Sequence, residues 1–222
     1  MGTRGAGRVV AGVLVGALLM YLVGCGGGDS SGSVSAESLQ ARLPPASLEP
    51  GYRVQRTFDW ADPVNLVGEG LALPAATRPA DAVKVFRDAN LQGATGEHLA
   101  QGTSPLDESI ITIGVAKFPS EAEATKVRDW MNGKDLQEPC YGACIFSPTP
   151  FAIPGVPTAK AVEQRPNQLA LKSDPTLDSR FRVVFTDGPY LHWIAVDGPH
   201  SSAPRVAAGA AAYYKGLTKA SG

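Results

Sequence analysis

The spacing of apolar residues predicts alternating strands and helices over most of the chain after residue 51. Alternating or β-branched apolar runs, the pattern of strands, occur at four places: 52–58, 110–118, 168–171 and 181–196. Apolar residues at helical spacing occur at three places: 80–90, 121–131 and 201–219. The predicted order is therefore strand, helix, strand, helix, several strands and a final helix.

Cap and turn residues define several of these boundaries. Ser120 and Glu123 have the spacing of a capping box and predict a helix start. Asn132-Gly133 predicts the end of that helix. Asp187-Gly188 is a favoured hairpin turn and divides the last strand segment into two paired arms. Residues 138–157 are rich in proline and are predicted to form a loop.

This order of elements predicts the α+β class. Because hairpins join the strands, we expect an antiparallel sheet with the helices packed on one of its faces. A strand followed directly by a helix occurs at 110–131 and again at 190–219. This single recurrence leaves a degenerate internal duplication open as an alternative.

The first residues have the pattern of a secretory signal. Arg4 and Arg8 give a positive start, and residues 9–23 are apolar apart from two glycines and one tyrosine. This apolar run is shorter than the roughly 20 residues with which a helix spans a bilayer. A polar stretch of Gly, Ser and Asp follows it directly.

Leu22-Val23-Gly24-Cys25, at the end of this stretch, resembles the lipobox of bacterial lipoproteins. The resemblance implies cleavage before Cys25, a palmitate-type lipid on its thiol, and attachment to the extracytoplasmic side of the cell membrane. Two or three acyl chains anchor a protein stably, whereas a single chain binds marginally. The alternatives are a plain secretory signal and an uncleaved anchor.

Three segments follow from this interpretation. Residues 1–24 are the predicted lipoprotein signal peptide, which is removed. Residues 25–50 begin with the lipidated Cys25 and are rich in Gly, Ser and Pro, so we expect them to form a flexible tether. Residues 51–222 are expected to form a single extracytoplasmic α+β domain.

Composition and charge exclude one class of partner. The 222 residues are 44% hydrophobic, which is enough for a buried core. Twenty basic and 21 acidic residues leave a formal net charge of -1. This balance does not provide the basic surface that neutralises phosphates, so no nucleic-acid partner is expected.

Cys140 and Cys144 lie in the proline-rich loop, with three residues between them. In an oxidising compartment outside the cytoplasm they most simply form a disulfide with each other. Free or metal-bound thiols remain an alternative. A redox-active pair is a further one, although such pairs favour two intervening residues.

The three histidines are His98, His192 and His200, and no two have metal-ligand spacing. The chain also lacks the HExxH, GxSxG and Ser-x-x-Lys patterns and a Gly-rich phosphate loop. We therefore expect no enzyme activity, no catalytic residue, no metal and no cofactor. His98 and His200 are predicted in solvated loops, and His192 on a strand.

Trp60, Tyr190, His192 and Trp193 form the candidate ligand or partner patch, because aromatic residues gather near the predicted loops and hairpin. The alternative is that these side chains belong to the core. The cysteine pair in its proline-rich loop and the late hairpin around 185–190 are similar to those of actinobacterial envelope lipoproteins. That resemblance implies a location and a general class, and no site residue.

These observations favour a membrane-tethered, non-catalytic binding or sensor-like module. Its partner would be a small apolar or glycan ligand, or another envelope protein. One alternative is an envelope assembly factor or a structural accessory protein. Another is a hydrolase whose catalytic residues are dispersed along the sequence.

Overall fold

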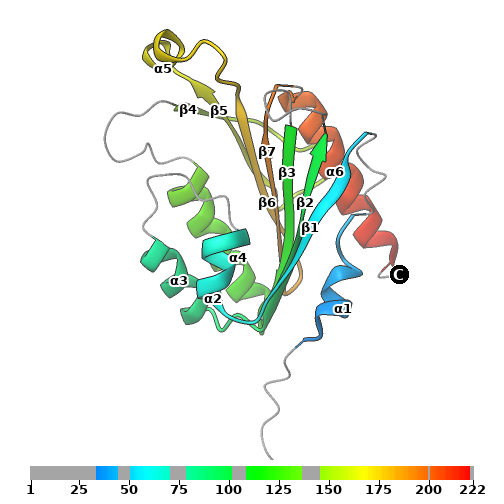
Figure 1. The fold of residues 1–222 in the computed structure, drawn as a ribbon. Helices are drawn as coiled ribbons and strands as arrows, with labels where there is room; N and C mark the ends of the chain where they lie inside the picture. Colours follow the sequence, from blue (N-terminus) through cyan, green and yellow to red (C-terminus); the bar gives the residue numbers. More distant parts are fainter. Residues whose placement is uncertain are drawn as a thin grey trace, which may run out of the picture. The chain divides into compact units, whose positions relative to one another are not determined.

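In the described part of the chain, seven strands form one antiparallel sheet (Figure 1). The computed structural model describes residues 34–44, 51–70, 79–101, 109–136, 146–199 and 201–220. The strands are β1 (Arg53–Trp60), β2 (Gly93–Gln101), β3 (Ser109–Lys117), β4 (Phe146–Pro150), β5 (Lys160–Pro166), β6 (Arg180–Asp187) and β7 (Tyr190–Asp197). Their order across the sheet is β1-β2-β3-β7-β6-β5-β4, so β3 and β7 pair at its centre.

Helices connect several of these strands. Those in the described residues are α1 (Ala36–Gln40), α2 (Pro63–Asn65), α3 (Pro79–Asp88), α4 (Glu121–Trp130), α5 (Gln168–Ser173) and α6 (Ala203–Ala220). Two π-helical segments continue α2 and α4, namely η2 (Leu66–Gly70) and η3 (Met131–Leu136). The described residues fall within one compact unit.

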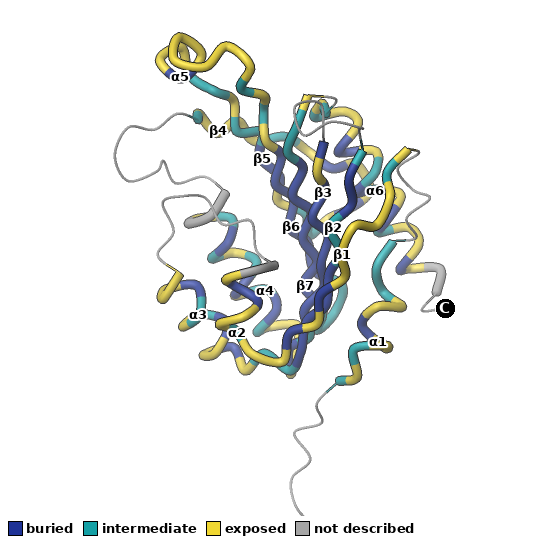
Figure 2. Tube along the Cα trace, in the orientation of Figure 1, coloured by how far each residue is buried: buried dark blue, intermediate teal, exposed yellow. Residues whose placement is uncertain are grey.

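Helices cover both faces of the sheet (Figure 1). We call the face to which Trp193 points the α4 face, because α3 and α4 pack against it through Phe86 and Val127. The other face, to which Ile194 points, is the α6 face, and α6 packs against it through residues such as Tyr213. In Figure 2 the central strands are buried between these two helical layers.

The α+β class and the antiparallel sheet are confirmed, but the prediction that the helices pack on one face is wrong. β3, β6 and β7 carry apolar side chains at consecutive positions, for example Val183 and Val184, which point to opposite faces. A strand that is apolar on both sides requires cover on both sides. α6 supplies the second layer.

The arrangement also argues against an internal duplication. In a duplication, a twofold rotation would exchange β3 with β7 and β2 with β6. Because these strands are antiparallel, the axis of that rotation is perpendicular to the sheet. The rotation would therefore leave each helix on the same face of the sheet. α4 follows β3 on one face, whereas α6 follows β7 on the opposite face. That rotation therefore cannot superpose the two strand–helix units.

Local boundaries differ from the sequence prediction in three places. Residues 168–171 form part of α5 rather than a strand, because the Asn167 side chain caps a helix by accepting a hydrogen bond from the Ala170 amide. α4 begins at its Ser120 cap as predicted, but the helical path continues through Asn132-Gly133 as η3. β2, β4 and β5 were not predicted, because their sequences are polar, glycine-containing or proline-containing.

Residues 34–44, which we call the strap, lie within the predicted tether yet pack against the domain. Their helix α1 begins at the Ser35 cap, and Leu39 is buried against β2 with 1% of its surface exposed. Gly93 at the start of β2 leaves room for this leucine, whose Cδ1 would lie 3.4 Å from a Cβ placed there. The folded part of the chain therefore begins before Gly51, by residue 34 at the latest.

Among the residues that the structure describes, no helix has both the length and the apolar character needed to cross a membrane.

Candidate ligand site

A small cavity lies on the α6 face, between α6 and the centre of the sheet. Its volume is about 40 Å³. The sheet contributes four β-branched side chains that the antiparallel register places as two facing pairs, Ile111 with Val196 and Ile113 with Ile194. Because each pair points to the same face, the floor of the cavity is apolar across both central strands.

The other walls come from α6 and from the N-terminal part of the domain. Val206, Ala210 and Tyr213 of α6 line the cavity from above the sheet, and Pro44 of the strap and Tyr52 complete its wall. Segments that are far apart in the sequence therefore meet at this one site.

Two polar residues of the cavity lining lie at the start of α6. Ser201 precedes the helix and Arg205 lies in its first turn. The N-terminal end of a helix also carries partial positive charge from its unpaired amides. This end of the cavity favours a negatively charged group, whereas the sheet side favours an apolar one.

A buried hydrogen-bonded chain lies beside the cavity and joins the sheet to the strap. His192 Nδ1 lies 2.8 Å from the Tyr213 hydroxyl, which donates to the Arg42 carbonyl oxygen at 2.7 Å. Since the hydroxyl proton goes to Arg42, the geometry assigns the imidazole proton to Nδ1. His192 Nε2 is then buried without a hydrogen-bond partner among the described residues.

Burial determines the protonation of both side chains in this chain. It lowers the pKa of His192 to about 3, and the nearby Arg42 cation acts in the same direction. Burial also raises the pKa of the Tyr213 hydroxyl well above its ordinary value. His192 is therefore neutral at physiological pH, stacked on Phe185 with ring centroids 4.8 Å apart.

Arg42 fastens the strap with its side chain as well as its carbonyl. Its guanidinium lies 2.9 Å from the Asp187 carboxylate, at the β6–β7 turn. The same group lies over the Tyr190 ring, 3.6 Å from its centroid. Both contacts are partly exposed, so each contributes modestly and the pair provides orientation.

A second hollow lies along the flank of α6 and is open to solvent. It is lined by small and apolar residues of the helix and of the loop after β4, among them Phe151, Pro154, Ala207 and Ala211. No charged side chain lines it. It therefore offers little to orient a ligand, and the first cavity is the stronger candidate.

The four residues of the predicted aromatic patch do not form one surface. Trp60 and Trp193 are buried on the α4 face, and His192 is buried on the α6 face. Tyr190 is half-buried at the hairpin, beneath Arg42. Of the four, only Tyr190 is partly exposed, and it contacts Arg42 of the strap. The two tryptophans belong to the core.

His98 and Arg182 show that other polar groups on the sheet are structural. His98 lies on β2 rather than in a solvated loop, with Nδ1 2.8 Å from the Thr112 hydroxyl. Arg182 is buried, which lowers its pKa, but its guanidinium donates to Asp197 and to the Phe181 carbonyl. Cys25, Cys140, Cys144 and His200 lie outside the described residues.

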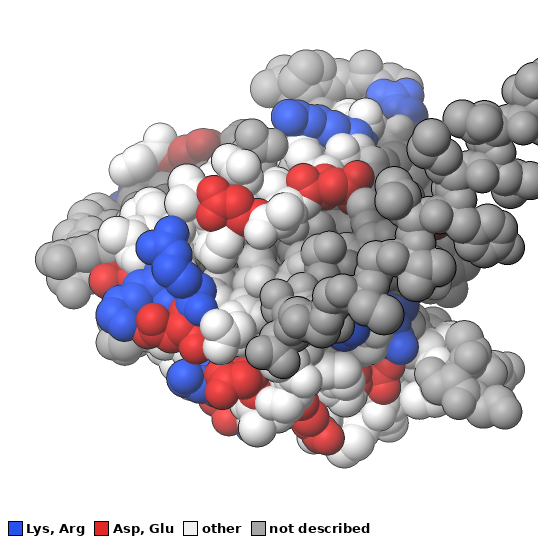
Figure 3. Space-filling model, turned by 90° about the horizontal axis from the view of Figure 1, so that it is seen from below, with Lys and Arg blue, Asp and Glu red and all other residues white. Residues whose placement is uncertain are grey.

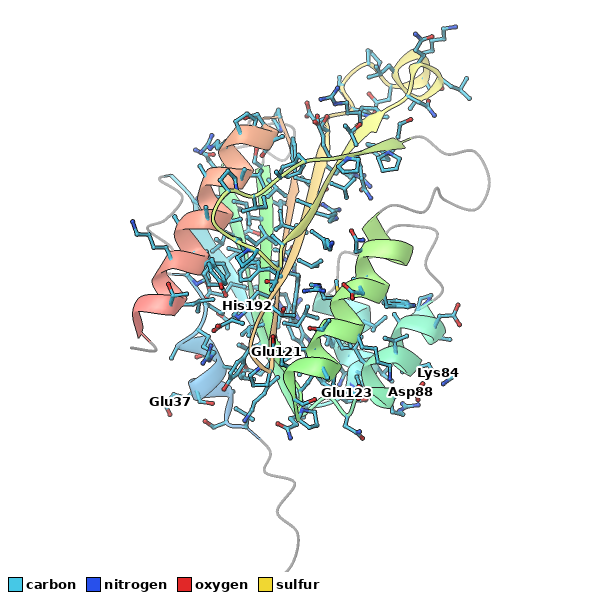
Figure 4. The ribbon with its side chains drawn as sticks, turned by 180° about the vertical axis from the view of Figure 1, so that it is seen from behind. Glu37, Lys84, Asp88, Glu121, Glu123 and His192 are labelled. Atoms are coloured by element: carbon cyan, nitrogen blue, oxygen red, sulfur yellow. The ribbon has the colours of Figure 1, made fainter. Side chains whose placement is uncertain are left out.

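Charged side chains do not converge on another site in the described part of the chain. In Figure 3 basic and acidic groups alternate on the face seen from below. In Figure 4, Glu121 and Glu123 come from α4, and Lys84 and Asp88 pair with each other on α3, while His192 lies among the strands. No group of three or more metal-ligating side chains occurs in the described ranges.

Sequence reasoning missed most of the cavity. Ile111, Ile113 and Ile194 were predicted as strand residues, but the pairing of β3 with β7 that brings them together was not. The sequence offered one signal for the polar end of the cavity. It is the pair Ser201 and Arg205, which lie four residues apart at the start of a predicted helix. The strap was visible only as two leucines, Leu39 and Leu43, at helical spacing.

Comparison with solved structures shows that the fold of this chain occurs in another protein. No protein-family model matches the chain, and no curated protein matches it. The chain is similar to the extracellular domain of PknH from Mycobacterium tuberculosis, with a TM-score of 0.52 and 14% sequence identity. The match covers 83% of this chain and 98% of that domain. At this identity the similarity shows the fold, and no residue role is carried over.

Proposed function

We propose that this chain is a lipid-anchored, extracytoplasmic and non-catalytic binding module, and that its ligand binds in the cavity between α6 and the sheet. The observation that carries the proposal is the cavity itself. Its apolar floor lies across β3 and β7, and its charged lining residue, Arg205, lies at the start of α6. Apolar walls with a few placed polar groups are the usual composition of a small-molecule site.

Two further observations support this function. The fold is shared with the extracellular domain of PknH, which fits a location outside the cytoplasm. The lipobox-like Leu22-Val23-Gly24-Cys25 supports a lipid anchor at the N-terminus. The strap, which follows the predicted anchor in the chain, contributes Pro44 to the cavity.

The perturbed histidine favours a structural role over catalysis. A histidine with a strongly shifted pKa is a candidate catalytic group when it lies in a cleft. His192 is instead fully buried, and it is absent from the lining of the cavity. A substrate in the cavity would have no access to its free nitrogen, so the pKa shift results from packing.

Native mass spectrometry of the full chain, released from its own membrane in mild detergent, tests the proposal. We expect an excess mass, beyond the attached lipid, that is lost on denaturation. Val196→Ile adds one methylene group to the cavity lining and should reduce the occupied fraction severalfold. Val184→Ile makes the same change on the α4 face and serves as the matched control. A bare protein mass, or equal losses in both variants, would contradict the proposal.

A protein partner is the second candidate, and one surface feature favours it. Leu169 and Leu171 of α5 are 64% and 40% exposed, which is unusual for two leucines so close together. α5 lies at the end of the sheet away from α1 (Figure 1). Crosslinking in the native membrane from a photoreactive residue at position 169 should yield a specific protein adduct, and Lys84 on α3 is the control position.

A further inference from the structure

The cavity is too small for an organic ligand as it stands. Its volume is about 40 Å³, whereas small-molecule sites usually enclose roughly 300–1,000 Å³. An empty apolar cavity needs on the order of 150 Å³ to admit a molecule the size of benzene. If the proposed site binds a ligand, one of its walls must therefore move.

The sheet and α6 are poorly suited to be that wall. β3 and β7 are the central strands and are hydrogen-bonded on both sides. α6 is a helix of 18 residues that is held by a line of buried side chains, including Val206, Ala210 and Tyr213. Moving either element would break the core of the α6 face.

The strap lies outside both the sheet and α6, and its one helix is short. α1 has five residues, well below the roughly 12–15 residues at which an isolated helix becomes stable. Its described attachments are the buried Leu39, the partly buried Leu43, the ion pair and ring contact of Arg42, the hydrogen bond from Tyr213 to the Arg42 carbonyl, and the hydrogen bond from Gln40 to Asp59 at 3.5 Å. Pro44, which lines the cavity, lies two residues after Arg42.

The lining also defines the chemistry of the ligand. β-branched residues of both central strands present only hydrocarbon, which suits an apolar tail. Arg205 and the N-terminal turn of α6 suit an anionic head. An ammonium head would meet like charge at the same place.

We propose that the strap is a displaceable plug of this cavity, and that the ligand is a single-chain amphiphile with an anionic head, such as a fatty acid. The inference rests on the proposed function, since it concerns the same site. Ligand binding and strap docking then exclude each other. Release of the strap adds residues 34–44 to the predicted tether, so the ligand lengthens the distance over which the domain can move from its proposed anchor.

Hydrogen exchange on the full chain in phosphatidylcholine nanodiscs tests this, with sodium decanoate as the probe. We expect decanoate to accelerate exchange of the strap amides, for example those of Leu39 and Ala41, at least tenfold. The first turns of α6 should exchange more slowly. Decyltrimethylammonium, which has the same tail and the opposite charge, should have neither effect.

The possible outcomes distinguish failure of the plug proposal from failure of the proposed ligand site. Protection of α6 with unchanged or slower exchange in the strap would overturn the plug and leave the proposed function standing. No change in either segment would overturn both the plug and the ligand class. Acceleration by both amphiphiles alike would overturn the anionic head and indicate a detergent effect.

Two variants sharpen the result. Arg42→Ala removes the ion pair with Asp187 and the contact with Tyr190, so the plugged state should become less populated and decanoate should bind about threefold to tenfold tighter. Arg56→Ala, which removes an arginine from the ring of Phe58 on the other face, is the matched control. Unchanged or weaker binding by Arg42→Ala would overturn the proposal. Tyr213→Phe removes the hydrogen bond to the Arg42 carbonyl of the strap and so tests the plug in a second way.

Discussion

The two faces of the sheet are packed in different ways, and the difference separates the stability of this domain from its proposed function. On the α4 face the Trp193 ring lies so close to Gly114 that a Cβ there would be 1.9 Å from ring carbon Cζ2. On the α6 face a cavity remains between helix and strands, and a neutral histidine is buried beside it. The Trp193 ring leaves no room for a side chain at Gly114, whereas the α6 face keeps a cavity with a buried histidine beside it.

The tight face should respond most strongly to the addition of one carbon atom. Gly114→Ala places a methyl group inside the Trp193 ring, and Gly96→Ala would place one 2.7 Å from the Ile113 carbonyl oxygen. We expect Gly114→Ala to lower the free energy of unfolding by about 3 kcal/mol or more, at the upper end of overpacking effects. Urea denaturation measures the loss.

A double variant assigns that loss to the ring. In a Trp193→Leu background the clash with Gly114→Ala is removed, so the added cost should fall below about 1 kcal/mol. A loss that is equal in both backgrounds would show that the tryptophan is not the obstacle.

The buried histidine of the other face predicts loss of stability in acid. The pKa of His192 is about 3 in the folded protein and about 6.5 in an unfolded chain. The unfolded state therefore binds a proton first as the pH falls. The stabilisation from the neutral imidazole is complete above pH 6.5 and declines as the pH falls toward 3, by at most about 1.4 kcal/mol per pH unit.

The variant His192→Gln isolates this contribution. It does not titrate, so its urea midpoint should fall less steeply between pH 6.5 and 4 than that of the natural chain, although it is less stable at pH 7. His98→Gln is the control, since His98 is only half-buried. Parallel pH curves for the natural chain and His192→Gln would contradict a buried neutral histidine.

The hydroxyl of Tyr213 should have a smaller effect that is concentrated on the strap. Tyr213→Phe removes the donor to the Arg42 carbonyl and leaves His192 Nδ1 without its partner. Leaving buried polar groups unpaired costs about 1–3 kcal/mol. Hydrogen exchange should accelerate more in residues 34–44 than in β3 or β7. Tyr214→Phe, one residue along the same helix, is the control and should leave the strap unchanged.

The sequence could predict the elements whose signals are local. The Ser120 cap, the Asp187-Gly188 turn and the β-branched run of β3 were all recognised, and so the α+β class followed. The signals of β2 are not local. Its Gly93 and Gly96 look like loop residues, but Gly96 is required because a Cβ there would lie 2.7 Å from the Ile113 carbonyl oxygen and 3.2 Å from the Trp60 ring.

The candidate site was harder to predict because it depends on pairing at long range. Ile113 and Ile194 are 2 of the 4 residues of its floor, and only the β3–β7 register brings them together. His192 was predicted on a strand, but its complete burial depends on Tyr213 and on a strap carbonyl 171 residues away from that tyrosine. Periodicity along one segment carries no information about such contacts.

The smallest predicted effects compare one identical substitution on the two faces. Val184→Ile adds a methylene group to the filled α4 face, where Val184 is buried, and should destabilise the domain by about 1 kcal/mol, as overpacking does. Val196→Ile adds the same group beside the cavity and should be neutral or stabilising by up to about 1 kcal/mol. Thermal unfolding of the two variants, measured side by side, gives the sign of each change.

If both valines respond alike, the cavity does not exist in solution, and the site loses its physical basis. Opposite signs would show that the space under α6 persists even though filling it is favourable, as expected when room for a ligand is retained at the expense of packing.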